Sequence, residues 1–385
     1  MSILLVASFT RFGLEEVFFI LLIFYTLLFF ISFKDILSKN YKDNFLIISI
    51  FMIINFALFV DVARDLQLNW DALTLWKLKA NHFYNGNNYF DITYYPDAYF
   101  PHPQYPHLGT YIWAFFWKNA ILDYEYLGRT FQTYLYVVSL FVLVVSFRFQ
   151  TNSKIFLGLV VLIFLTYDPD LRGYQDIYIF SLIIFFGFFI YEKFRLDTNL
   201  NSFIILIPLI LPWIKNEGIF YSIFLLIIYF IVEKNSLKKF IFPLVILLTI
   251  FLQLYLNISY FNLNTLFQFE INSSNIFNDQ GFTLLLNKFI KILFYSSHAF
   301  FKHPILILDA FIIFISFYYL KLDRNILPFY IFLILCISFI FGIYVFTPND
   351  IKWHLQSSVD RLLLQTSGIY IYLLVILNDK KIIKI

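Results

Sequence analysis

The chain has 385 residues, of which 61% are hydrophobic and only 14% are charged, and its formal net charge is +3. A soluble domain carries roughly a quarter charged residues, so this composition excludes an ordinary soluble protein and indicates an integral membrane protein of the all-α class. The single cysteine, Cys336, excludes an internal disulfide and any metal site built from several cysteines. We expect no nucleic-acid partner.

Apolar runs close to the length that crosses a bilayer predict about eleven transmembrane helices in one domain spanning 1–385. They fall near 16–33, 45–60, 131–147, 155–167, 177–191, 202–214, 218–232, 239–258, 304–320, 326–347 and 361–378. Basic connections such as 34–44 and 148–154 share one side in this arrangement, so that side should be cytoplasmic. The outer side then carries a first loop, 61–130, and an interfacial segment, 259–303.

The first outer loop opens with the polar and aromatic stretch NWDALTLWKLKANHFY, residues 69–84, which we expect to be helical. By helical spacing, one face would carry Asp71, Thr74, Leu75, Leu78 and His82. A carboxylate on such a helix can accept a proton from an alcohol. Asp is also a favoured N-cap, so a purely structural capping role for Asp71 stays open.

A proline-rich stretch, YFPHPQYPHLGTY at 99–111, comes next in the same loop. Its prolines forbid a regular helix and favour an extended turn. The turn carries His102 and His107. One pair of histidines spaced this way is a weak metal signal, so a substrate-facing loop is the preferred interpretation.

Ionisable residues interrupt the apolar chain at two later outer turns. Asp176 stands in GYQDIYIF, where an outer-facing helix begins, and Lys215 and Glu217 stand in WIKNEGIF between two expected spans. Charged groups at membrane depth are costly and suggest a functional site. The alternative is a Lys–Glu ion pair at the interface, with Gly218 serving the turn.

The last outer turn, TPNDIKWHLQSSVDR, precedes the final expected span. Arg361 can bind a phosphate through two hydrogen bonds, or it can simply extend toward the interface. Lys352 and His354 would extend such a phosphate site. Asp309, inside an expected span, should face the interior of the bundle, and the sequence suggests no role for it.

Together these segments resemble the GT-C glycosyltransferases, polytopic enzymes that use a polyprenyl-phosphate sugar. Protein O-mannosyltransferases and lipid A aminoarabinose transferases belong to this superfamily. The resemblance rests on Asp71 early in the first outer loop, on the "KA" after it, and on HPQYP before an apolar helix. GYQDIYIF, WIKNEGIF and SVDRLLLQ are similar to motifs of an uncharacterised bacterial branch. The chain departs from the family at Ala72, where many members carry a second acid.

The resemblance implies a transferase that moves a sugar from a polyprenyl-phosphate donor to an acceptor hydroxyl with inversion. Asp71 would be the base and Asp176 a second acidic site residue. The substrate-binding residues would be Lys215, Glu217, Arg361, His102, His107, Lys352 and His354. No cofactor is certain, and a divalent cation held by the carboxylates stays open. The acceptor is a lipid, a glycan or a protein.

The expected location is the bacterial inner membrane, with the lipid bilayer around the bundle and the site on the periplasmic face. One alternative is an O-antigen polymerase or ligase, but such proteins typically have their large loop late in the chain. The other is a transporter of lipid-linked sugars. It would show repeat symmetry and charges near the middle of the membrane, and the sequence shows neither.

Overall fold

The computed structural model describes the chain except for residues 11, 39–41, 65–67, 69, 94–104, 148–153, 155–156, 159–160, 162–172, 197–199, 234, 257–278, 321–325, 348–349 and 380–385. Within the part that is described, all regular structure is helical and strands are absent, which confirms the all-α class. The expected span at 155–167 and residue His102 lie mostly or wholly outside the described residues.

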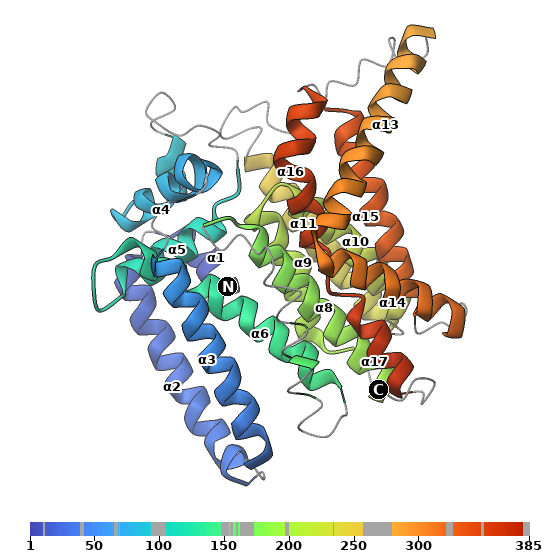
Figure 1. Ribbon diagram of the computed structural model, residues 1–385. Helices are drawn as coiled ribbons and strands as arrows, with labels where there is room; N and C mark the ends of the chain where they lie inside the picture. Colours follow the sequence, from blue (N-terminus) through green and yellow to red (C-terminus); the bar gives the residue numbers. More distant parts are fainter. Residues whose placement is uncertain are drawn as a thin grey trace.

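The N-terminal third forms a helical hairpin followed by a segment of short helices (Figure 1). Its elements are α1 (Ser2–Ser8), α2 (Leu14–Ser38), α3 (Lys42–Arg64), the π-helix η1 (Ala72–Trp76), α4 (Lys77–Tyr84), the 3-10 helix η2 (Tyr89–Thr93), α5 (Leu108–Lys118) and the 3-10 helix η3 (Glu125–Arg129). The expectation of a helix within 69–84 is confirmed, although its first part is a π-helix.

The remaining elements build the main bundle. They are α6 (Thr130–Ser146), α8 (Asp176–Leu196), the 3-10 helix η4 (Ser202–Ile205), α9 (Leu206–Ile214), α10 (Glu217–Val232), α11 (Ser236–Tyr255), α13 (Asp279–Lys302), α14 (Pro304–Leu320), α15 (Leu327–Val345), α16 (Ile351–Gln365) and α17 (Ile371–Asp379). In Figure 1 the C-terminal end of α2 and helix α17 lie low, whereas α4 and α16 lie high.

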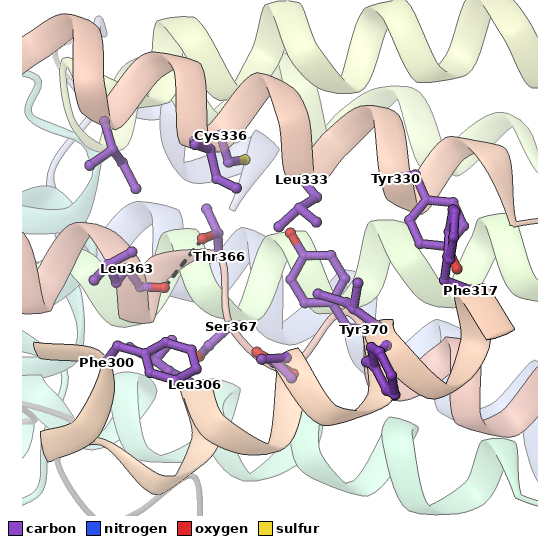
Figure 2. Close-up of a pocket in the computed structure, with 16 residues that line it drawn as sticks. Phe300, Leu306, Phe317, Tyr330, Leu333, Cys336, Leu363, Thr366, Ser367 and Tyr370 are labelled. Atoms are coloured by element: carbon purple, nitrogen blue, oxygen red, sulfur yellow. Dashed lines mark hydrogen bonds between the residues drawn. The ribbon is translucent and has the colours of Figure 1, made fainter. Parts of the chain in front are cut away.

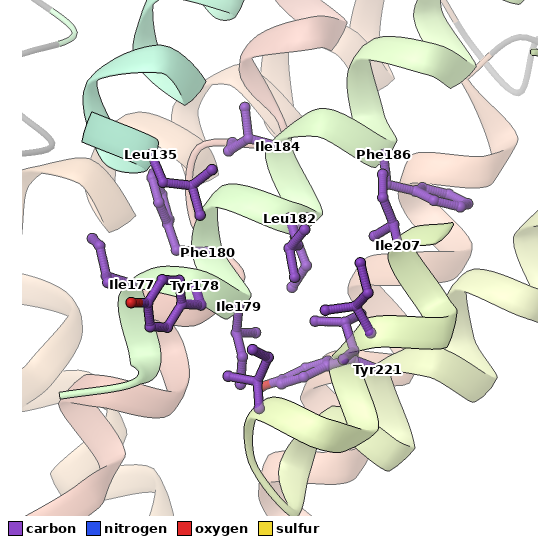
Figure 3. Packing of buried hydrophobic residues seen from close by; sticks show 14 of the residues in the cluster. Leu135, Ile177, Tyr178, Ile179, Phe180, Leu182, Ile184, Phe186, Ile207 and Tyr221 are labelled. Atoms are coloured by element: carbon purple, nitrogen blue, oxygen red, sulfur yellow. The ribbon is translucent and has the colours of Figure 1, made fainter. Parts of the chain in front are cut away.

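Helix α8 forms the centre of the bundle. It is apolar on all sides, as expected of a helix surrounded by protein, and 72% of its most hydrophobic window is buried, against 17% for α11. Figure 3 shows its side chains packed against Leu135 of α6, Ile207 of α9 and Tyr221 of α10. The position of α8 places its first residue, Asp176, among several other helix ends.

Many large apolar side chains are exposed on the outside of the bundle. Examples are Phe56 of α3, Phe240 of α11 and Phe314 of α14. Four described helices, or five if α13 and α14 count as one span bent by 98°, are long and apolar enough to cross a membrane. An extended apolar surface of this kind is compatible with a multi-pass membrane protein.

The prediction of one continuous helix at 361–378 is wrong. Helix α16 begins earlier, at Ile351, and ends at Gln365, and α17 starts at Ile371. Gly368, in the connection, has φ +77°, a conformation that side-chain-bearing residues rarely adopt. Its N–H donates a hydrogen bond to Asp309 of α14 at 2.8 Å, so the break is held by a buried acid. The SVDRLLLQ stretch therefore belongs to the end of α16.

Candidate functional site

Five ionisable side chains from separate parts of the chain meet at one end of the bundle. We call them the charge cluster: Asp71, Asp176, Lys215, Glu217 and Arg361. Arg361 Nη1 lies 2.7 Å from Asp71 Oδ2 and 4.0 Å from Asp176 Oδ2, and Lys215 Nζ lies 3.0 Å from Asp176 Oδ1 and 3.2 Å from Glu217 Oε1. The two cations thus join three carboxylates into one continuous network.

Asp71 precedes the π-helix η1, but its side chain makes no capping hydrogen bond. The capping interpretation is therefore wrong. Instead Oδ2 accepts a hydrogen bond from Arg361, 290 residues further along the chain. The other oxygen, Oδ1, makes no hydrogen bond with the described residues. The carboxylate is about a quarter exposed, so a substrate can reach it.

A close contact brings Asp71 to the start of α8. Gly173 has φ +92°, and a Cβ there would lie 3.0 Å from the Cβ of Ala72 and closer still to the ring of Trp113. Only glycine fits this position. Ala72 is fully buried, so a second acid could not stand there without a partner. Packing thus explains why a small apolar residue stands at position 72.

Asp176 and Glu217 are the first residues of α8 and α10, where the helix dipole favours negative charge. Lys215 lies between α9 and α10 and is buried. Burial lowers the pKa of Lys215, but Asp176 and Glu217 outweigh this effect and hold the pKa above its usual value. Lys215 therefore stays protonated. The expected Lys–Glu pair exists, but it is part of a larger network that includes α8.

Arg361 lies on α16, with its guanidinium 4.5 Å from the centre of the Tyr174 ring. Burial lowers the pKa of Arg361, and the nearby Asp176 and Asp71 carboxylates more than offset this. Gln365, one turn later, donates a hydrogen bond to Asp176 Oδ1. The side chain of Arg361 thus points into the cluster, and the interpretation that it only extends toward the interface is wrong.

The other residues predicted on α16 take different positions. His354 lies seven residues before Arg361 and therefore on the same face of α16. Burial lowers the pKa of His354; the charge of Glu217 raises this pKa and the charge of Arg361 lowers it, so both residues lie near the ring. Its Nδ1 lies 2.9 Å from the Thr347 hydroxyl. Lys352 is exposed and lies nine residues before Arg361, which places it on the opposite side of the helix. The structure therefore brings His354, but not Lys352, toward the cluster.

His107 is a core residue at the start of α5. It is fully buried, its Nε2 lies 2.7 Å from the Ser8 hydroxyl, and the rings of Tyr89 and Trp213 pack against it. Burial holds the pKa of His107 well below its usual value, so the ring is neutral. The structure places His107 behind the cluster rather than in it.

Sequence reasoning missed Lys79. It is fully buried on α4 and donates a 2.6 Å hydrogen bond to the carbonyl of Tyr105, whose hydroxyl lies within electrostatic reach of Glu217 and Lys215. Burial lowers the pKa of Lys79 to about 7. Lysine is rarely buried, and no feature of the sequence indicates that this one is.

Two carboxylate oxygens of the cluster, Asp176 Oδ2 and Glu217 Oε2, are buried without a hydrogen-bond partner among the residues that the structure describes. Such acceptors can receive hydrogen bonds from the hydroxyl or amine groups of a bound ligand. Among the residues that the structure describes, no group of three or more His, Cys, Asp or Glu side chains could hold a metal ion.

Comparisons with protein-family models, with curated proteins and with solved structures each found no match. The function must therefore be argued from the geometry of the cluster and the bundle.

Proposed function

We propose that the chain is a polytopic membrane glycosyltransferase that moves a sugar from a polyprenyl-phosphate donor to an acceptor hydroxyl, with inversion, at the outer membrane face. About eleven spans, the bacterial inner membrane and a periplasmic site are part of this proposal. The observation that carries it is the meeting of Asp71, Asp176, Lys215, Glu217 and Arg361 at one end of an apolar helical bundle.

In the proposed reaction, Asp71 Oδ1 accepts the proton of the acceptor hydroxyl. The hydroxyl oxygen then forms a bond to the anomeric carbon of the sugar while the bond from that carbon to the phosphate oxygen breaks. The polyprenyl phosphate leaves with the bonding electrons, and nearby cations stabilise its charge. Asp176 and Glu217 would bind sugar hydroxyls through Oδ2 and Oε2, the oxygens that make no hydrogen bond with the described residues.

The charge balance adds one requirement. Three carboxylates already surround two cations, so an incoming phosphate must compete with Asp71 for Arg361. Because the Asp71–Arg361 pair is the most exposed link of the network, it is the one that a phosphate can open most readily. Donor binding would thereby release Asp71 to act as the base.

The test is a transfer assay with the full chain in lipid nanodiscs, a panel of polyprenyl-phosphate sugars, and lipid and glycan acceptors. Asp71→Asn should lower turnover by a factor of about 100 to 10,000, as expected for loss of a general base. Asp123→Asn, an exposed acid in the same loop, is the matched control. Unchanged turnover of Asp71→Asn would refute the role of this residue.

A second variant addresses the phosphate. Arg361→Lys keeps the charge but loses the planar two-bond geometry, so the KM for the donor should rise more than kcat falls. A change confined to kcat would place Arg361 outside the phosphate site.

One observation favours a second candidate, a transporter: buried Asp309 lies beside the break between α16 and α17, an arrangement known from transport proteins. In the same nanodisc panel a transporter would produce no transfer product with any donor. Sealed vesicles would instead show movement of the lipid-linked sugar across the membrane.

A further inference from the structure

A cavity of about 520 Å³ lies among α14, α15 and the break between α16 and α17 (Figure 2). Its size is that of a pocket for a small organic ligand. Apolar side chains such as Leu306, Leu333 and Ile340 form most of its wall. None of the residues that line it belongs to the charge cluster, so this is a separate site.

The cavity has an opening on the apolar surface of the bundle. Phe314, Phe317 and Ile337 line it, and their side chains are 72%, 59% and 47% exposed. An apolar chain can therefore enter from the surrounding lipid without crossing water.

One acid lies inside this apolar wall. Asp309 is only 4% exposed; its Oδ2 accepts the N–H of Gly368 at 2.8 Å, whereas its Oδ1 is buried without a partner among the described residues. A buried carboxyl oxygen without a partner is costly, and the cost is recovered when a ligand supplies a donor. None of the lining residues is Lys, Arg or His, so the cavity itself offers no cation.

Two hydroxyls at the break, those of Thr366 and Ser367, offer acceptors rather than donors. Thr366 Oγ1 donates to the carbonyl of Leu363 at 3.2 Å, and Ser367 Oγ donates to the carbonyl of Leu364 at 2.8 Å. Each hydroxyl has one hydrogen, so only lone pairs remain for a ligand. Near Asp309 the cavity therefore favours a group that donates several hydrogen bonds and carries positive charge.

We propose that this cavity binds a long-chain primary amine in its protonated form. The ammonium group pairs with Asp309 Oδ1 and donates to the Thr366 and Ser367 oxygens, and the chain extends along the apolar wall to the opening. An anionic lipid is disfavoured because none of the described lining residues is a cation, and an alcohol has only one hydrogen to donate. The proposal does not rest on the transfer reaction.

The test compares dodecylamine, dodecanol and dodecyl phosphate on the full chain in nanodiscs of a zwitterionic lipid. Two readouts are the thermal unfolding midpoint and the rate at which N-ethylmaleimide alkylates Cys336, the sole cysteine, which lines the cavity. Dodecylamine should raise the midpoint and slow alkylation, and dodecanol should need about tenfold higher concentration. If Cys336 is unreactive in the empty protein, the thermal shift decides alone.

Two variants locate the effect. Asp309→Asn keeps the shape and should remove the preference for the amine over the alcohol. Ala310→Leu keeps the acid but fills part of the cavity, so it should weaken both ligands, and it serves as the test if Asp309→Asn does not fold. Equal effects of all three compounds, or an amine effect that survives both folded variants, would overturn the proposal.

Discussion

The charge cluster allows a quantitative prediction about Lys215, whose side chain is 7% exposed and bridges Asp176 and Glu217 at 3.0 and 3.2 Å. Lys215→Met removes the cation, which leaves Glu217 without an ion pair and Asp176 with only the more distant Arg361 at 4.0 Å. Breaking a buried ion pair from one side costs about 3–5 kcal/mol, and we expect a loss of about 4 kcal/mol in the free energy of unfolding. Asp176→Asn should lower the free energy of unfolding by about 3 kcal/mol, a smaller loss because Lys215 still pairs with Glu217.

The double variant gives the decisive comparison. When both partners are removed, only Glu217 is left without its cation, whereas Lys215→Met alone deprives Asp176 of this cation as well, so the loss should fall short of the sum of the single losses by about 2 kcal/mol. Unfolding is measured in mixed micelles with increasing sodium dodecyl sulfate, and Lys352→Met, on an exposed lysine, should change stability by no more than about 0.5 kcal/mol. Additive losses, or a Lys215→Met loss below about 1 kcal/mol, would refute this account of the network.

Three further predictions concern the surroundings of the cluster. Folding lowers the pKa of Lys79 from 10.5 to about 7, so between these pH values the unfolded chain binds a proton that the folded chain does not. The free energy of unfolding should therefore rise with pH across this window, by at most about 1.4 kcal/mol per pH unit. In a series of thermal melts at increasing pH, Lys79→Met should lack this rise. In Gly218→Ala the new methyl group would overlap the carbonyl oxygen of Leu211 in α9, and the free energy of unfolding should fall by about 2 kcal/mol or more. Gly342→Ala has open space around the new methyl group and should stabilise the protein by about 1 kcal/mol. Thermal melts of both variants test this contrast. Deletion of the exposed Leu73 should turn the π-helix into an α-helix and rotate Asp71 by about 100°. Transfer activity should then be lost, and the melting temperature should fall because the same rotation moves buried Ala72 and breaks the Asp71–Arg361 pair.

Many helices could be predicted from the sequence because each is an apolar run that ends at a charge. The expected segments 131–147 and 218–232 match α6 and α10 to within a residue. The run 361–378 failed because the break is marked only by the short uncharged stretch Gln365–Gly368, and a few polar residues of this kind can also stand inside a single span. The break is held open by Asp309 on another helix, and a contact of that kind is invisible in a local pattern.

The residues of the charge cluster could be predicted from the sequence because charged residues are rare in this chain. In an apolar chain every charged turn needs a partner, so the few that occur near one membrane face are candidates to meet. The pairing could not be anticipated, because Arg361 joins Asp71 and Asp176 only through the packing of α16 beside α8. His107 was misassigned because a histidine in a polar, proline-rich stretch was expected to be accessible, whereas Ser8 and several rings bury it.

The expected face of the 69–84 helix is wrong at one residue. Leu75 and His82 are buried, but Leu78, which lies with His82 on the regular helix α4, is 37% exposed. The π-helix before α4 bears on the direction of Asp71 instead. A π-turn contains one more residue than an α-turn, which rotates the residues before it by about 100° relative to the residues after it. Helix α4 can thus pack its buried face on α5 while Asp71 points toward α16. Local irregularity of this kind often accompanies functional sites, and here it reconciles a buried loop helix with an accessible carboxylate.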